Sequence, residues 1–226
     1  MLYFKKKDNN FIEAIKILNS LKIDYWICHG TLLGIIRNKS PLTWDPDIDI
    51  GIWKKDLNLN KIITEFKKKG FLKKKKFFLN DNLLTFSKFG NRDIDINLYE
   101  ISNNKNFAYQ RHFAIKNLFM RLIYILSVAN NYSGRHKFLV SKIKIFKPLF
   151  LILKNFFIKK KIFYSTAGFF TAKKYFKFKK KIFYHEIAVP IPYKYDEYLK
   201  CVYGKNWRKP QKNYNWEKNP NVSHIN

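Results

Sequence analysis

Cysteine is scarce in this chain of 226 residues, and so are long apolar runs. Cys28 and Cys201 are the only cysteines, too few for a disulfide framework or a four-cysteine zinc site. The best apolar runs, 118–129 and 148–158, are each interrupted by a cation and fall short of the roughly 18–20 residues that span a bilayer. The charged N-terminus is followed by no apolar core. The sequence therefore predicts neither a secretory leader nor a spanning helix.

Acidic residues are also few: 16 Asp and Glu stand against 45 Lys and Arg, which gives a formal net charge of +29. This excess permits nucleic acid, anionic lipid or an anionic substrate as partner, without choosing among them. A bias toward AT-rich codons is an alternative explanation, because Asn, Ile, Phe and Tyr are abundant together with Lys. The apolar fraction of 46% predicts a folded globular chain, and the two cysteines fit a reducing, cytoplasmic compartment.

Hydrophobic periodicity predicts an α+β fold. Apolar residues recur at helical spacing over 11–22, 56–69 and 195–203, with Asp56 as the predicted cap of the second helix. They alternate as in a strand over 47–53 and 92–99, and residues 71–89 have the pattern of a hairpin. From residue 104 to about 181 the chain is basic, aromatic and predicted to be mainly helical. We therefore expect a catalytic core at 1–103 and a basic helical region with a C-terminal tail at 104–226, packed on the core as one unit.

The sharpest chemical signal is Trp44-Asp45-Pro46-Asp47-Ile48-Asp49. On a strand, alternate residues share a face with Cα atoms roughly 6.5–7 Å apart, so Asp47 and Asp49 can converge on a cation. Mg²⁺ prefers such carboxylate oxygens together with substrate phosphates. The alternative is the polar face of a strand at a sheet edge, although close carboxylates without a cation repel one another.

Asp93-Ile94-Asp95 repeats this pattern on a later predicted strand. If the two strands are neighbours, Asp93 or Asp95 joins the first pair and supplies a further metal ligand or a general base. The alternative is a surface strand in which Asp93 pairs with Arg92 or a nearby lysine.

A third element, His29-Gly30-Thr31-Leu32-Leu33-Gly34, is followed by Arg37. Gly30 permits a sharp turn and close approach to a ligand, and Thr31 can cap a helix whose free N–H groups face a phosphate. Arg37 can add a forked contact to phosphate. His29 is either a substrate contact or a structural histidine. The alternative for the whole element is an ordinary capped helix with a surface arginine.

The order of these motifs resembles the LicD/fukutin-related family of the nucleotidyltransferase superfamily. Pro192-Tyr193, Tyr198-Leu199, Tyr203-Gly204 and Pro210 are similar to the family's closing pattern. The resemblance implies a mixed β-sheet flanked by helices. It also implies transfer of a phosphorylated alcohol, such as phosphocholine or ribitol phosphate, from a CDP-linked or other nucleotide donor to a glycan or lipid-linked glycan, with release of CMP.

The resemblance also implies roles for individual residues. Asp47 and Asp49 would hold Mg²⁺ or Mn²⁺, with Asp95 as third carboxylate and general base, and Asp93 could replace Asp95. The donor side would comprise Gly30, Thr31, Arg37 and the supporting acid Asp45. The cysteine-rich zinc insert of some animal relatives is absent from this sequence.

Two alternatives remain open at this point. The enzyme could attach a whole nucleoside monophosphate and release pyrophosphate, or the chain could be a basic binding protein without catalysis. Residues 138–164 interleave Lys with Phe, Leu and Ile, a pattern that suits either a helix on an anionic membrane or a helix packed on the core. We expect a cytoplasmic protein with a peripheral contact at the inner membrane face, and no nucleic-acid partner.

Overall fold

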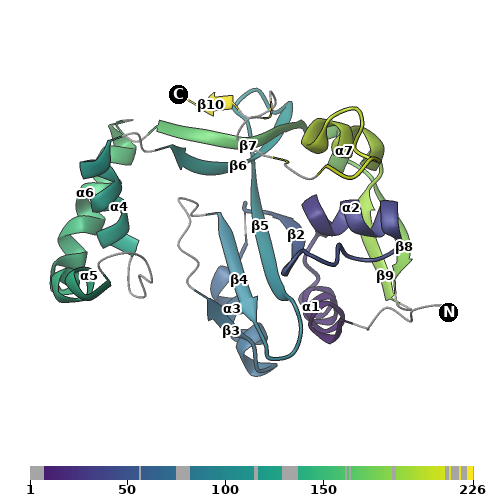
Figure 1. Cartoon of the computed structure of the whole chain (residues 1–226), viewed down its shortest axis with the longest axis horizontal. Helices are drawn as coiled ribbons and strands as arrows, with labels where there is room; N and C mark the ends of the chain where they lie inside the picture. Colours follow the sequence, from purple (N-terminus) through teal and green to yellow (C-terminus); the bar gives the residue numbers. More distant parts are fainter. Residues whose placement is uncertain are drawn as a thin grey trace. The chain divides into compact units, whose positions relative to one another are not determined.

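The computed structural model describes residues 8–55, 57–74, 82–114, 117–128, 137–160, 162, 164–184, 187–211, 214, 219 and 223–225. The chain forms two compact units (Figure 1). The core unit comprises segments 1–74, 82–110 and 168–222, and the helical unit comprises 75–81, 111–167 and 223–226. Both units draw on residues beyond 103, where the sequence suggested a boundary.

The core unit contains most of the strands. Its helices are α1 (Asn9–Ser20), α2 (His29–Asn38), α3 (Leu59–Lys68) and α7 (Tyr195–Tyr203), with the 3-10 turn η2 (Lys173–Phe176). Its strands are β1 (Tyr25–Ile27), β2 (Asp47–Trp53), β3 (Leu72–Lys74), β4 (Leu83–Ser87), β5 (Asp93–Ile101), β8 (Lys179–Tyr184) and β9 (Ile187–Pro192). Strands β6 (Phe107–Ala114) and β7 (Tyr164–Ala172) each have residues in both units.

The helical unit is built around α4 (Leu118–Val128) and α6 (Lys147–Lys159). Between them in the sequence come α5 (Lys137–Ile143) and the 3-10 turn η1 (Lys144–Phe146), and β10 (Ser223–Ile225) pairs antiparallel with β7. Within the described part of the chain, every helix is too short or too polar to cross a membrane.

The centre of the core unit is a parallel pair of strands in an otherwise antiparallel sheet. Strand β2 pairs parallel with β5, in a register that places Asp47 opposite Asp93 and Asp49 opposite Asp95. Strand β1 extends the sheet beyond β2, and β4 then β3 extend it beyond β5, all antiparallel. The mixed sheet with helices confirms the predicted α+β class.

Period-two alternation explains why β2 and β5 lie at this centre. Ile48, Ile50 and Ile52 are fully buried, as are Ile94 and Ile96 on the neighbouring strand. Burying an isoleucine side chain contributes about 1.5–3 kcal/mol, so this register is strongly favoured over a one-residue slip that would bury the aspartates instead. The hydrophobic pattern thus fixes the aspartates on one face.

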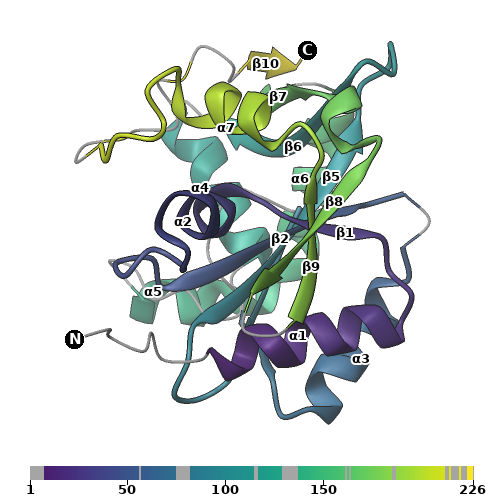
Figure 2. The same cartoon turned by 90° about the vertical axis from the view of Figure 1, so that its right-hand side faces the viewer.

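A second packing region lies around Trp26 on β1. Its ring contacts Trp53, Tyr99 and Phe176 with centroid separations of 4.9, 5.1 and 4.8 Å. Gly51 on β2 makes room for it, because a Cβ there would lie 2.5 Å from the indole. The hairpin β8–β9 packs beside β1, and α1 lies next to α3 (Figure 2).

Three local expectations need correction. Helix α3 is capped by the Asn58 side chain, which accepts from the Lys61 N–H at 3.0 Å, while Asp56 lies outside the described residues. Thr31 does not cap α2, since the helix begins at His29 and Thr31 already lies in its first turn. Of the described residues in 104–181, α4, α5 and α6 are helices as expected, whereas β6, β7 and the start of β8 are strands, so the expected helical character holds only in part.

Gly34 provides a test of how closely α2 packs on the loop that leads to β2. A Cβ at residue 34 would lie 2.6 Å from the Ser40 carbonyl oxygen and 2.7 Å from the Leu42 nitrogen, both backbone atoms. We predict that Gly34→Ala lowers the free energy of unfolding by about 1–3 kcal/mol, despite the better helix propensity of Ala. Urea denaturation measures this. An unchanged or higher stability would contradict the close packing.

Candidate active site

Three carboxylates gather where β2 begins. Asp45, Asp47 and Asp49 each offer an oxygen within 4.8 Å of the others, and we call these residues the carboxylate cluster. Asp47 and Asp49 share one face of β2, and Asp45 belongs to the preceding loop, whose N–H at residue 45 donates to the Leu42 carbonyl at 3.2 Å. A single hard cation of the Mg²⁺ or Mn²⁺ type fits this all-oxygen set.

The electrostatics of the cluster are unfavourable without a cation. Burial, a hydrogen bond to Asp47 and the charge of Asp47 raise the pKa of Asp45 to about 7, while Arg92 acts in the opposite direction. Burial and the charges of Asp47, Asp45 and Asp95 raise the pKa of Asp49 well above its ordinary value. The neighbouring carboxylates thus penalise ionisation of Asp45 and Asp49, and a bound cation would remove this penalty.

The two candidate residues on β5 are in different environments. Asp93 forms an ion pair with Lys74, with 2.7 Å between Oδ2 and Nζ, as in the alternative weighed from the sequence. Asp95 is buried, accepts a hydrogen bond from the Thr85 hydroxyl at 2.6 Å, and adds its charge to those that raise the pKa of Asp45 and Asp49. Electrostatically, Asp95 belongs with the carboxylate cluster.

Backbone and amide contacts hold Asp49 in place. The buried Thr31 hydroxyl accepts a hydrogen bond from the Asp49 N–H at 2.8 Å, so Thr31 positions the backbone of β2. The Asn97 amide donates to Asp49 Oδ1 at 3.1 Å, and Gln110 donates to Asn97 Oδ1 at 2.7 Å. Asn97 is a further residue of the site that the motifs did not indicate, although it follows Asp93 and Asp95 on the same face of β5.

Gly30 lies directly against the cluster. A Cβ on this residue would lie 2.2 Å from Asp45 Oδ2 and 3.6 Å from Asp49 Oδ2. Any side chain at residue 30 would therefore occupy the position of a carboxylate oxygen. The sequence predicted that the Gly30 backbone closely approaches a ligand; in the structure the group beside it is the Asp45 carboxylate.

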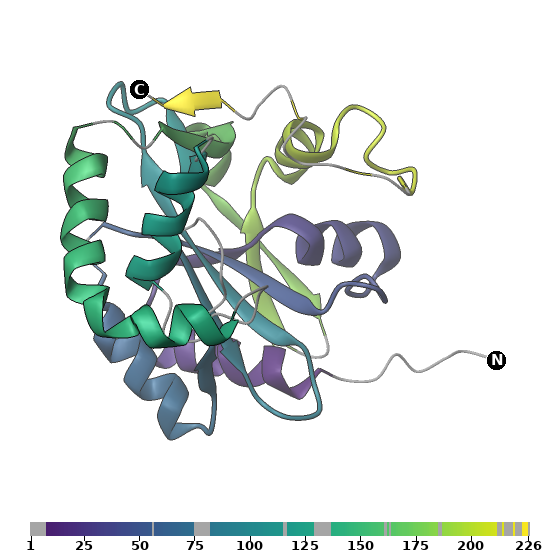
Figure 3. The ribbon, with the colours of Figure 1, turned by 60° about the vertical axis from the view of Figure 1, so that its left-hand side comes forward.

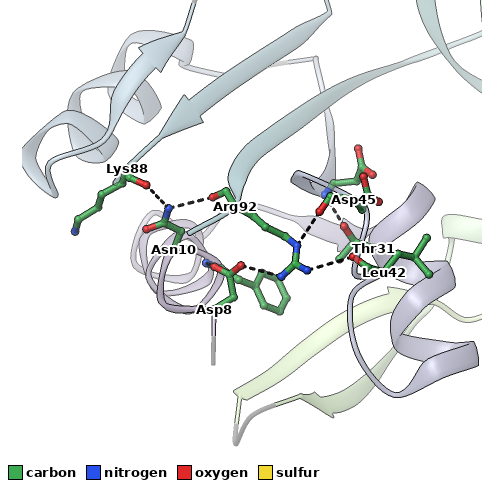
Figure 4. A network of polar contacts seen from close by, with 9 residues as sticks. Asp8, Asn10, Thr31, Leu42, Asp45, Lys88 and Arg92 are labelled. Carbon is green, nitrogen blue, oxygen red and sulfur yellow. Dashed lines mark hydrogen bonds and ion pairs between the residues drawn. The ribbon is translucent and has the colours of Figure 1, made fainter. Parts of the chain in front are cut away.

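Arg92 organises the loop that carries Asp45 (Figure 4). Its Nε donates to the Asp45 carbonyl at 2.9 Å and its Nη2 to the Leu42 carbonyl at 3.2 Å. Its Nη1 donates to Asp8 Oδ2 at 3.3 Å, and Asp8 in turn caps α1. Asn10 donates to the backbone carbonyls of Arg92 and Lys88. The loop is thus tied to the first helix through one guanidinium group.

His29 is held between two tyrosines. Its Nε2 lies 3.0 Å from the Tyr99 hydroxyl and its Nδ1 lies 3.2 Å from the Tyr198 hydroxyl. The backbone at His29 has a φ of +46°, an uncommon conformation for a non-glycine residue. These contacts support the structural alternative for His29 and connect α7, part of the C-terminal motif, to the start of α2.

Arg37 and Asp45 line a pocket of about 280 Å³ in the core unit. The pocket is lined by Gly30, Leu33, Arg37, Leu42, Trp44, Asp45, Tyr203, Trp207, Lys209, Gln211 and Tyr214. Arg37 also donates to the Trp207 carbonyl at 3.4 Å. Two cations and several aromatic rings adjoin the carboxylate cluster here, an arrangement suited to a phosphorylated ligand with a planar group.

The fold and the aspartate pairs agree with a known family. Residues 22–117 match the family described as LicD/FKTN/FKRP, nucleotidyltransferase domain. This segment is a LicD-type nucleotidyltransferase domain. The resemblance inferred from the motifs is thereby confirmed, and the LicD-type domain contains the carboxylate cluster, Gly30 and Asp95.

Relatives of known sequence agree with this. The ribitol-5-phosphate transferase FKTN of Macaca fascicularis is 23% identical over 218 residues, which cover 96% of this chain and 36% of the relative. The human protein of the same name gives the same values. The uncharacterized protein RP689 of Rickettsia prowazekii (strain Madrid E) is 37% identical over 71 residues, which cover 31% of this chain and 25% of the relative. This chain thus spans about a third of the length of the FKTN relatives.

Among solved structures, the lincomycin-bound lincosamide antibiotic adenylyltransferase LnuA superimposes with a TM-score of 0.44. The sequence identity is 10%, and the superposition covers 84% of this chain and 83% of the other.

The raised pKa of Asp45 makes a prediction for the metal-free protein. The carboxyl is protonated in the folded state up to about pH 7 but loses its proton near 3.8 when unfolded, so stability falls as pH rises between these values. Asp45→Asn removes this contribution. Between pH 5 and 8 we expect the melting temperature to fall less in the variant than in the wild type. The difference between the two falls should be roughly 2–4 °C, the shift expected for about 1 kcal/mol. The measurement is thermal denaturation of both proteins across this pH range in the presence of a metal chelator. An equal fall in melting temperature for the variant and the wild type would contradict the prediction.

The Arg92 network predicts a large effect of a single substitution. Arg92→Ala leaves Asp8 buried without its cation and releases the carbonyls of Leu42 and Asp45, so we expect a loss of about 3–5 kcal/mol in unfolding free energy. Lys68→Ala is the matched control, because it removes an exposed ion pair to Glu65 and should cost less than about 1 kcal/mol. Equal losses in urea denaturation would show that Arg92 does not organise the loop.

Proposed function

We propose that this chain is a metal-dependent transferase that moves a phosphorylated alcohol from a CDP-linked donor to a glycan hydroxyl and releases CMP. The observation that carries the proposal is the carboxylate cluster at the start of β2 in the LicD-type domain. The likeness to proteins named ribitol-5-phosphate transferase supports a polyol phosphate as the transferred group.

The residues present suit a divalent cation. Asp47 and Asp49 would hold Mg²⁺ or Mn²⁺, with Asp45 at the same site and Asp95 beside it. The three carboxylates lie close together, and the raised pKa values of Asp45 and Asp49 give the cluster a strong reason to bind a cation. When bound, the ion would supply positive charge to the phosphate oxygens of the donor.

The pocket beside the cluster would receive the nucleotide part of the donor. Arg37 and Lys209 provide cations for phosphate oxygens, and Trp44 and Tyr203 provide rings for a planar base. Trp44 is largely exposed, so its indole is available to a ligand. The absence of a side chain at Gly30 leaves room for the Asp45 carboxylate within the cluster.

Asp95 would act as the general base. The oxygen of the acceptor hydroxyl forms a bond to the phosphorus of the transferred group, the bond from that phosphorus to the CMP oxygen breaks, and the hydroxyl proton passes to Asp95. The hydrogen bond from Thr85 orients the Asp95 carboxylate for this role. The acceptor would be a glycan or a lipid-linked glycan.

The aspartates of β5 offer a matched test of these roles. We predict that Asp95→Asn lowers turnover by roughly 10²–10⁴, the usual contribution of a general base. The Asn oxygen can still accept from Thr85, so the fold should persist. Asp93→Asn removes only the pair with Lys74, and its activity should stay within about threefold of wild type.

The assay supplies Mn²⁺ or Mg²⁺ with CDP-ribitol, CDP-choline or CTP and a glycan acceptor, and the released nucleotide is identified. CMP supports the proposal. Pyrophosphate would instead assign nucleotidyl transfer. Equal loss in both β5 variants would contradict the assignment of the base, and activity in Asp49→Asn would contradict the metal site.

A further inference from the structure

Helix α6 of the helical unit carries two apolar stripes. On one side, Phe150, Leu153 and Phe157 pack with Ile123 and Tyr124 of α4. Lys154, which interrupts the apolar run in the sequence, is on this packed side, with its Nζ 5.0 Å from the centroid of the Tyr124 ring. The cation is therefore accommodated by the contact with α4.

The second stripe is exposed and contains no charged residue. It consists of Ile145, Leu149, Ile152 and Phe156, which are 79%, 52%, 65% and 48% exposed. Leu149, Ile152 and Phe156, at spacings of three and four residues, lie along one side of α6 away from the packed stripe, and Ile145 precedes them in η1. We call these four residues the exposed stripe. Figure 3 shows α4 to α6 as the teal and green helices of this unit.

Further exposed apolar side chains adjoin the exposed stripe in the sequence. Phe138 and Leu139 of α5 and Phe146 of η1 are all more than half exposed. The surface of a soluble protein usually exposes large apolar residues singly, so this dense group of exposed Phe, Leu and Ile side chains indicates an interaction site.

The charge around the stripe has one sign. Residues 111–167, the main segment of the helical unit, contain no Asp or Glu but 12 Lys and Arg. Lys142, near the end of α5, and Lys159 and Lys160, at the end of α6, flank the exposed stripe and are exposed. A second copy of this chain would bring two acid-free surfaces together, so charge complementarity favours an anionic partner with an apolar interior.

We propose that the exposed stripe lies in the interface of an anionic lipid bilayer. Helix α6, with 13 residues, is about 20 Å long and too short to span, which suits a helix that lies in the membrane plane. Apolar side chains of the stripe enter the acyl boundary, and the flanking lysines reach the phosphate headgroups. This binding does not depend on the carboxylate cluster or on catalysis.

The test is flotation of the full chain with vesicles of phosphatidylcholine alone or mixed with phosphatidylglycerol. We expect the wild type to float with the anionic vesicles, less so at high salt, and to stay behind with phosphatidylcholine alone. The triple variant Ile145→Ser, Ile152→Ser, Phe156→Ser should bind at least about tenfold more weakly.

A matched control removes equally exposed apolar side chains from the core unit: Leu72→Ser, Phe89→Ser, Phe183→Ser. It should float as the wild type does. If the first triple variant does not fold, the double variant Lys142→Glu, Lys159→Glu takes its place. Because it reverses two of the flanking charges, it should also bind anionic vesicles more weakly than the wild type.

Several results would overturn the proposal. One is a wild type that ignores anionic vesicles, and another is flotation unaffected by both sets of variants in the helical unit. A wild type that fails to float but forms a dimer, lost in the triple variant on gel filtration, would assign the stripe to self-association.

Discussion

The parallel pairing of β2 with β5 is the constraint on which the rest of the site depends. The register that buries Ile48 and Ile50 against Ile94 and Ile96 also brings two Asp-x-Asp pairs side by side. The free energy gained by burying the isoleucines thus offsets the repulsion between the aspartates that this register brings together. Burial, together with the charges of the neighbouring carboxylates, raises the pKa of Asp45 and Asp49.

The contacts around these strands limit how the carboxylates can relax. Arg92 holds the backbone of the loop that carries Asp45, and the Thr31 hydroxyl holds the Asp49 N–H. Gly30 occupies the space beside Asp45 without a side chain. A cluster fixed in this way cannot relieve its repulsion by moving apart, so protonation or a cation must do so.

Much of this arrangement could be predicted from local sequence patterns. Alternation gave β2 as residues 47–53, and the repeated Asp-x-Asp motif suggested that two strands share the site. The role of Arg92 could not be predicted, because its partners Asp8 and Leu42 are 84 and 50 residues away. Nor could periodicity separate β6 to β8 from helices, since Lys and aromatic residues alternate irregularly there and pairing partners decide the outcome.

Manganese binding tests the central claim, that the carboxylate cluster holds a divalent cation, most directly. Electron paramagnetic resonance of free Mn²⁺, titrated with metal-free protein, reports binding without any donor or acceptor. Our account predicts saturable binding by the wild type and its loss in Asp47→Asn. Absence of saturable binding by folded wild-type protein, or equal binding by the variant, would contradict it.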